Sequence, residues 1–182
     1  QLASLCIAEG KAAWRASLDV YILDADGAVL DASLLASLAA LRNTRIPAVR
    51  NTREGHYVAA RGASAAAAAA AGGGGDTGLV AGSPSCIGLF RTPLGVTCCL
   101  YRQHLLVDPT ADEERLAECA VTVVLDQAGR LQGVYKPGGK VLADAATLVR
   151  CTEAARLRHR DLSGLLEESL GQQGATAQAA GP

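Results

Sequence analysis

The chain has 182 residues, a formal net charge of −1 and a pI near 6.3, so it lacks the overall positive field that would attract nucleic acid without a local basic patch. Its length suits one compact domain or parts of two, and no run of large apolar residues is long enough for a transmembrane helix. The chain begins at Gln1 and contains no methionine, which predicts a fragment or a processed chain.

Six cysteines and three histidines are scattered without the spacing of a metal site or a disulfide framework. Most of the cysteines lie within apolar runs, where a thiol behaves as a small buried hydrophobe. Unpaired buried cysteines favour a reducing compartment, the cytosol or the nucleus. We therefore expect neither a bound metal nor another cofactor.

The N-terminal third predicts a strand, a turn and a helix. Residues 17–23 alternate apolar and polar side chains, as a strand does, and the stretch 24–27, DADG, predicts a turn in which Gly27 takes a positive φ. Residues 30–43 predict a helix capped by Asp31, with its leucines on one face. The strand has no partner nearby, so we expect it to complete a sheet whose other strands lie outside this sequence.

The middle of the chain contains a low-complexity stretch followed by a series of predicted strands. Residues 62–78 are of low complexity, and 51–85 is interpreted as a flexible surface insertion or linker. Its glycines are not followed by the lysine of a phosphate-binding loop, which disfavours phosphate binding there. Beyond it, short apolar runs separated by turns predict an antiparallel meander, with strands at 86–91, 94–101, 104–108, 121–126 and 130–135.

Residues 143–170 predict one long helix with apolar side chains at helical spacing. Its other positions include four arginines, Arg150, Arg156, Arg158 and Arg160. These arginines could contact RNA phosphate, but a solvated charged face is the commoner arrangement. Residues 171–182 predict a disordered tail. The layout as a whole predicts an α+β fold in which helices cover a mostly antiparallel sheet.

Four acids, Asp108, Asp112, Glu113 and Glu114, lie within seven residues just before an apolar strand-like run. Carboxylates in such a place can hold a metal or transfer protons, and they can equally form a solvated turn.

Several stretches carry a resemblance to a known family. Residues 10–49 resemble the end of the first half of an RNase PH-like domain, and HLLVDPTADEERL (104–116), VTVVLDQAGRLQGVYKPGG (121–139) and the final helix resemble its second half. The pattern is most similar to the RNase PH-like ring subunits of the eukaryotic RNA exosome. This resemblance implies the latter part of a ribosomal protein S5 domain 2-like fold, divided into 1–50 and 86–170.

The resemblance also implies a function. Such domains form a ring around a channel for RNA, and active relatives degrade RNA from the 3′ end with phosphate as nucleophile and a divalent metal. Their two catalytic aspartates, six residues apart, fall on Glu114 and Ala120 in this sequence. Because a methyl group cannot ligate a cation, the resemblance implies a non-catalytic structural subunit with no catalytic residue of its own.

Two alternatives stay open. An active phosphate-dependent exoribonuclease would need a shifted register in which Asp112 and Glu118, also six apart, converge. Another S5-type fold, such as a small-molecule kinase, is the second alternative. The leading interpretation implies RNA, other RNase PH-like ring subunits and S1/KH cap subunits as partners, no membrane, and a location in the nucleus, nucleolus and cytoplasm. No RNA-binding residue is assigned from the sequence.

Overall fold

The computed structural model describes residues 5–52, 54–59, 79–81, 85–89, 91–139 and 144–179. The chain divides into two compact units, Gln1–Leu18 with Leu41–Phe90, and Asp19–Ala40 with Arg91–Pro182. These units differ from the predicted segments, because residues 19–40 group with the C-terminal part of the chain. The low-complexity stretch at 62–78 lies outside the described residues.

The first unit contains short antiparallel strands. The strand β4 (Val49–Asn51) lies between β5 (Tyr57–Ala59) and β6 (Leu79–Ala81), and Val49 is buried. The other strands form two pairs, β1 (Cys6–Ala8) with β2 (Ala12–Ala13), and β3 (Arg45–Ile46) with β7 (Ser85–Cys86).

The predicted strand at 86–91 is wrong over most of its length. Only Cys86 belongs to a strand, and that strand pairs with β3 rather than joining the meander. Residues 87–89 have no regular structure, and Phe90 lies outside the described residues. Gly88 contributes no side chain to pack and weakens a strand interior, which explains why the run does not extend.

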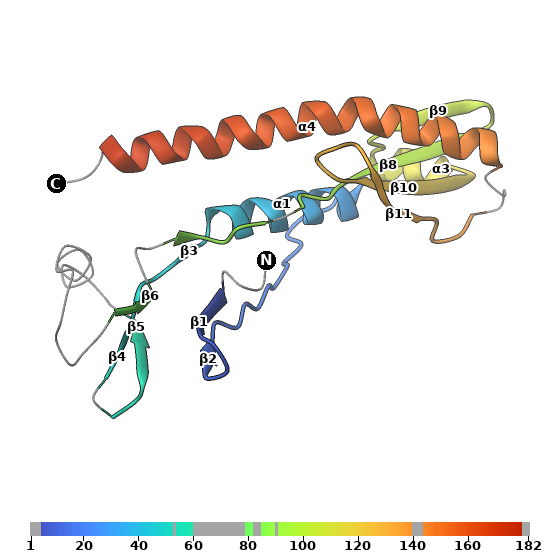
Figure 1. The fold of residues 1–182 in the computed structure, drawn as a ribbon. Helices are drawn as coiled ribbons and strands as arrows, with labels where there is room; N and C mark the ends of the chain where they lie inside the picture. Colours follow the sequence, from blue (N-terminus) through green and yellow to red (C-terminus); the bar gives the residue numbers. More distant parts are fainter. Residues whose placement is uncertain are drawn as a thin grey trace. The chain divides into compact units, whose positions relative to one another are not determined.

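The second unit is built on a four-stranded antiparallel sheet in the order β11-β10-β8-β9 (Figure 1). The rest of the predicted meander is therefore confirmed. Gly129 has a φ of 70° in the turn before β11, where a side chain would be strained. The strands are β8 (Leu94–Tyr101), β9 (His104–Val107), β10 (Cys119–Leu125) and β11 (Leu131–Tyr135).

The core of this unit lies between one face of the sheet and the helix α4 (Ala145–Ala179), which runs along it (Figure 1). Because side chains alternate along a strand, every second residue of β8 and β10 points at the helix. On the helix side, the small side chains of Cys151 and Ala155 allow α4 to approach the sheet closely. The sheet contributes Val96, Cys98, Cys119, Val121, Val123 and Leu125.

The buried thiols confirm the prediction that cysteines behave as core residues here: Cys98, Cys99, Cys119 and Cys151 are all free and buried. Burial raises the pKa of the Cys99 thiol to about 11, so this thiol is protonated and unreactive at neutral pH.

Both long predicted helices are present. The helix α1 (Val29–Asn43) buries Leu38. The helix α4 starts after Asp144, whose carboxylate accepts a hydrogen bond from the Thr147 amide at 2.8 Å. It continues to Ala179 through most of the segment predicted as a disordered tail, and residues 180–182 lie outside the described part. Within the described ranges, none of the helices combines the length and the apolar character needed to cross a membrane.

The predicted strand at 17–23 is wrong: residues 14–22 have no regular structure. Its apolar side chains are exposed, with Leu23 at 97% and Tyr21 at 83% of their full accessible surface. A strand requires a hydrogen-bonded neighbour, and no described segment pairs with this one. The alternating pattern is thus present without the partner that would turn it into a sheet.

Candidate functional site

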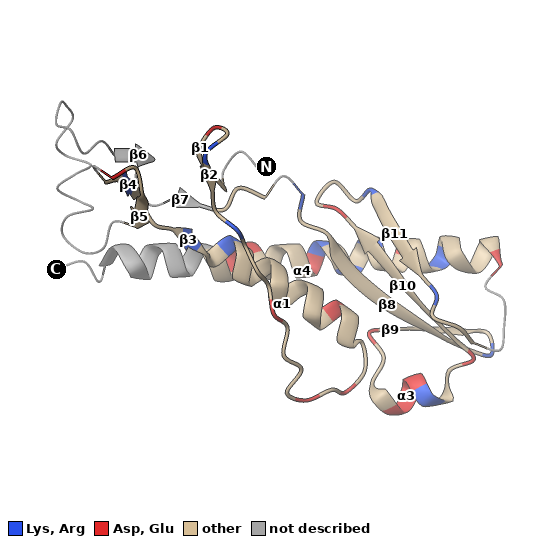
Figure 2. Ribbon diagram, turned by 90° about the horizontal axis from the view of Figure 1, so that it is seen from below, with Lys and Arg blue, Asp and Glu red and all other residues tan. Residues whose placement is uncertain are grey.

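The acidic run forms a short and largely exposed helix, α3 (Ala111–Leu116), rather than a turn. Thr110 caps this helix, and Glu113 completes a capping box by accepting a hydrogen bond from the Thr110 amide at 2.9 Å. Asp112 forms an exposed ion pair with Arg115 at 2.8 Å. Figure 2 shows these charges on the surface of α3. The TxxE spacing at 110–113 is the signal that could have revealed the helix.

Glu114, the first of the two family carboxylate positions, holds the start of α1. Its Oε1 atom accepts a hydrogen bond from the Ala28 amide at 2.9 Å, across 86 residues of sequence. A second bond runs in the opposite sense, since the Ala111 amide donates to the carboxylate of Asp26 at 3.1 Å. The loop before α1 and the start of α3 are therefore joined by two hydrogen bonds, and Glu114 is a structural residue.

Gly27 lies inside this junction. It has a φ of 80°, and a Cβ atom at its position would stand 2.1 Å from the Pro109 carbonyl oxygen. The positive φ that the sequence predicted for Gly27 is confirmed, but the close approach of the two backbones makes glycine necessary for a second reason.

Ala120, the second family position, lies in β10 directly opposite Cys99 of β8. It is on the face of the sheet away from α4, because Cys119 and Val121 on either side belong to the core. Its methyl group offers no ligand. Among the described residues, no cluster of three or more His, Cys, Asp or Glu side chains could hold a metal ion. Glu118 follows α3, and its amide donates to the Leu100 carbonyl.

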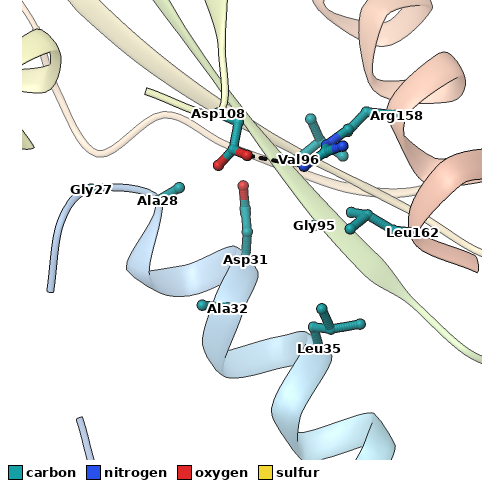
Figure 3. A pocket seen from close by; sticks show the side chains of 10 residues that line it. All are labelled: Gly27, Ala28, Asp31, Ala32, Leu35, Gly95, Val96, Asp108, Arg158 and Leu162. Atoms are coloured by element: carbon teal, nitrogen blue, oxygen red, sulfur yellow. Dashed lines mark hydrogen bonds and ion pairs between the residues drawn. The ribbon is translucent and has the colours of Figure 1, made fainter. Parts of the chain in front are cut away.

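A pocket of about 250 Å³ lies beside these positions, between the start of α1, the edge of β8 and α4 (Figure 3). Two carboxylates, Asp31 and Asp108, point into it and toward each other, and Arg158 approaches from α4. Apolar or small residues complete the lining: Gly27, Ala28, Ala32, Leu35, Gly95, Val96 and Leu162.

Asp31 does not cap α1 as predicted, because the helix starts earlier, at Val29, and Asp31 lies within its first turn. Its carboxylate instead accepts hydrogen bonds from the amide and the hydroxyl of Thr97 in β8. Gly95 makes room for it, since a Cβ there would stand 2.8 Å from the Asp31 Oδ1 atom. Burial raises the pKa of the Asp31 carboxyl despite the Thr97 hydrogen bonds, and the nearby charges of Asp108 and Glu114 raise it further.

Asp108 has a backbone φ of 58°, which is unusual for a residue other than glycine. Its amide donates to the Thr97 carbonyl at 3.0 Å, and its carboxylate accepts from Arg158 at 3.1 Å. Both partners of this ion pair are about half exposed, so it adds little stability. No pattern in the sequence predicts that these residues lie together, because Asp31, Asp108 and Arg158 come from three distant stretches.

Each carboxylate of this region thus has a hydrogen-bond partner within the protein. Asp31 binds Thr97, Asp108 binds Arg158, and Glu114 binds the Ala28 amide. Catalysis by general acid–base chemistry or by a metal needs convergent groups that are free to act on a substrate. In the alternative pair, the Asp112 carboxylate is paired with Arg115 on the exposed face of α3.

Comparison with known proteins finds relatives among components of the exosome complex. Rrp42, an exosome complex component of Methanosarcina acetivorans, is 30% identical over 166 residues, which are 91% of this chain and 52% of that protein. The zebrafish (Danio rerio) exosome complex component RRP45 is 25% identical over 169 residues, or 92% of this chain and 38% of that protein. The chain thus spans about half the length, or less, of the curated relatives it matches.

Solved structures give the same fold. A structure described as the Archaeoglobus fulgidus exosome with RNA bound to the active site matches 78% of this chain and 44% of its own, at 25% identity and a TM-score of 0.51. An archaeal exosome core matches 80% of this chain and 46% of its own, at 24% identity and a TM-score of 0.53. The predicted fold, an RNase PH-type α+β domain with a mostly antiparallel sheet and covering helices, is confirmed.

Two family models match the chain: domain 1 of the 3′ exoribonuclease family at residues 1–47, and domain 2 of the same family at residues 92–157. Together they match more than half of the sequence, in the order in which the family carries them. The protein therefore belongs to the 3′ exoribonuclease family, the RNase PH family.

Proposed function

We propose that the protein is a non-catalytic structural subunit of the RNA exosome core ring, which supports 3′-to-5′ RNA processing and degradation by forming the channel and contacting RNA. One observation carries the absence of catalysis. Of the two positions where the resemblance places the family's carboxylates, Glu114 is bonded to the Ala28 amide and Ala120 has only a methyl group.

The chemical reason is one of placement. A divalent metal assists phosphoryl transfer only when its ligands fix it next to the reacting oxygens. A displacement of about 1 Å can already cost roughly 100-fold in rate, and here one ligand is absent. The other would have to leave a backbone amide that lies 2.9 Å away. The remaining role is assembly, which the relatives named as exosome components support.

The finer assignment is also our proposal. The VDPT stretch followed by acids, together with the KPGG stretch, is most similar to the ring subunit called ribosomal RNA-processing protein 43. Its partners would be other RNase PH-like ring subunits, S1/KH cap subunits and RNA. Its place would be the nucleus and nucleolus, with a share in the cytoplasm, and its processes would be rRNA maturation and mRNA decay.

Affinity purification of the tagged full-length protein from its own cells, followed by mass spectrometry, tests the assembly. We expect a stoichiometric set of RNase PH-like and S1/KH proteins that is absent when the tag alone is expressed. The identity of the missing RNase PH-like subunit in that set also identifies the position that this protein fills. Recovery of the protein alone, or as a homo-oligomer, would contradict the structural role.

The alternative function, an active phosphate-dependent exoribonuclease, makes the opposite prediction in a direct assay. We expect the purified full-length protein, given labelled RNA, phosphate and Mg²⁺, to release nucleoside diphosphates no faster than a protein-free control. The reason is that the Asp112 carboxylate is paired with Arg115 and Ala120 supplies no ligand. Phosphate-dependent release that disappears in the Asp112→Asn and Glu118→Gln variants would establish the alternative instead.

A further inference from the structure

A second pocket, of about 500 Å³, lies between α4 and the turn that joins β10 to β11. It shares no lining residue with the pocket around Asp31 and belongs to the same compact unit. The turn contributes Gln127, Ala128, Gly129 and Arg130, and α4 contributes Arg156, His159 and Arg160. Figure 2 shows basic residues on both elements.

Two of the arginines stand one helical turn apart. Arg156 and Arg160 are related as i and i+4, and both are exposed. Like charges at this spacing repel each other and destabilise a helix. Within the part of the chain that the structure describes, neither is joined to a carboxylate by an ion pair. An anion seated between them would remove this repulsion.

Arg130, the third arginine of the pocket, is oriented by a bond to Asp126. The Nε atom of Arg130 donates to Asp126 at 2.9 Å, and this bond orients the guanidinium while leaving the side chain 62% exposed. Asp126 itself is fully buried, so it exposes no carboxylate surface to the pocket, although its charge offsets part of that of Arg130. The pocket therefore presents a cationic rim made of one oriented guanidinium and two unpaired ones.

His159 belongs to the buried part of the lining. It is only 4% exposed, and its Nε2 atom has no hydrogen-bond partner among the described residues. Burial lowers the pKa of the ring, although the Asp126 charge and the Leu125 carbonyl act to raise it. The ring is therefore neutral at physiological pH, and the charge of the pocket comes from its arginines.

We propose that this pocket binds a phosphate group, supplied by the backbone of single-stranded RNA or by free inorganic phosphate. Guanidinium groups match phosphate oxygens in geometry and charge. Among the described lining residues none is acidic, and Ala128 alone has an apolar side chain, so an acidic peptide would find little apolar surface to bury. The lining also contains no Phe, Tyr or Trp for base stacking, so recognition is independent of sequence. The RNA source rests on the proposed function, whereas the phosphate site does not.

The test compares two double variants of the purified full-length protein. Arg156→Gln/Arg160→Gln removes two charges from the pocket, and Arg102→Gln/Arg150→Gln removes the same number elsewhere. Glutamine keeps helix propensity at 150, 156 and 160, and Arg102 is exposed in the turn between β8 and β9, so both variants are expected to melt like the wild type in circular dichroism. Binding of a fluorescein-labelled poly(U) oligonucleotide is followed by anisotropy over a series of salt concentrations, with phosphate, sulfate and a poly-glutamate peptide as competitors at constant ionic strength.

We expect the pocket variant to lose about tenfold in RNA affinity and to lower the slope of log affinity against log salt by about 1.4, from two contacts at about 0.7 each. The control variant should lose less than about threefold. Phosphate binding in isothermal titration calorimetry, without binding of the RNA probe, identifies free phosphate as the source and leaves the site intact. Equal losses in both variants, binding of neither probe, or stronger competition by poly-glutamate than by phosphate would overturn the proposal.

Discussion

Replacing Gly27 with alanine is expected to lower the free energy of unfolding by about 4 kcal/mol, through overlap with backbone and a left-handed φ. The added Cβ would lie 2.1 Å from the Pro109 carbonyl oxygen, 2.6 Å from the Thr110 carbonyl carbon and 2.9 Å from the Ala111 amide nitrogen. None of these atoms is the end of a flexible side chain. Relief requires separating the loop from α3, which also breaks the Glu114 and Asp26 hydrogen bonds.

Gly129→Ala is the matched control. Gly129 has a φ of 70°, close to the 80° of Gly27, but a Cβ there would meet no atom within 4 Å. Its substitution should cost about 1 kcal/mol, the strain of the left-handed conformation alone. Urea unfolding of both variants at pH 7 separates the two contributions. Equal losses would mean that the junction between the loop and α3 does not form in solution.

The second large effect is expected at Asp126, which follows β10 and is fully buried. Its Oδ1 atom accepts hydrogen bonds from the amides of Ala128 and Arg130, both at 3.0 Å. Its Oδ2 atom accepts from Arg130 Nε at 2.9 Å and Gln132 Nε2 at 3.0 Å. An asparagine amide group would place a donor against these donors, so Asp126→Asn should lower the melting temperature at pH 7 by about 10 °C.

The effect of Asp126→Asn on the melting temperature is also expected to depend on pH. Burial alone would raise the pKa of the Asp126 carboxyl, but the hydrogen bonds from Arg130 and Ala128 outweigh it, and the pKa lies below its ordinary value of 3.8. A depressed pKa stabilises the fold fully above the unfolded value, and this contribution is lost as the pH falls through the folded value. The difference in melting temperature between wild type and Asp126→Asn should therefore be full at pH 7 and shrink below pH 3.8.

Thermal melts at several pH values measure this difference. Asp112→Asn is the control, because the Asp112 side chain is 86% exposed and its one ion pair lies on the surface. We expect its melting temperature to stay within about 1 °C of the wild type. A difference at Asp126 that is independent of pH would show that lost packing, and not the charge, causes the destabilisation.

The sheet of the second unit could be predicted from sequence because its signals are local. Short apolar runs mark β8, β9 and β10, and the turn glycine at 129 marks the hairpin. The strand at 17–23 could not be judged in the same way, since alternation specifies a face but not a partner. The capping box at Thr110 was a local signal too, but the resemblance drew attention to the acids as ligands rather than to the helix they begin.

The site was harder to predict than the fold. The resemblance placed the family's carboxylate positions at Glu114 and Ala120, but it could not show that Glu114 binds an amide 86 residues away. Asp31 meets Thr97 across 66 residues, and Arg158 meets Asp108 across 50. Such contacts are fixed by the packing of helices on the sheet, so no spacing rule in the sequence reveals them.

The bond from Thr97 to Asp31 has a consequence for solubility. Among the described residues, β9 pairs with β8 only from Cys98 onward, and the Asp108 amide bonds the Thr97 carbonyl, so residues 94–96 form a sheet edge without a strand partner on that side. Free edges recruit strands from other molecules, and a charge pointing inward at the edge prevents this. The Asp31 carboxylate already occupies the Thr97 amide, and an incoming strand would have to displace it and bury its charge. The Asp31 side chain thus lies where a fifth strand could be added. It ends the sheet there and protects it against aggregation.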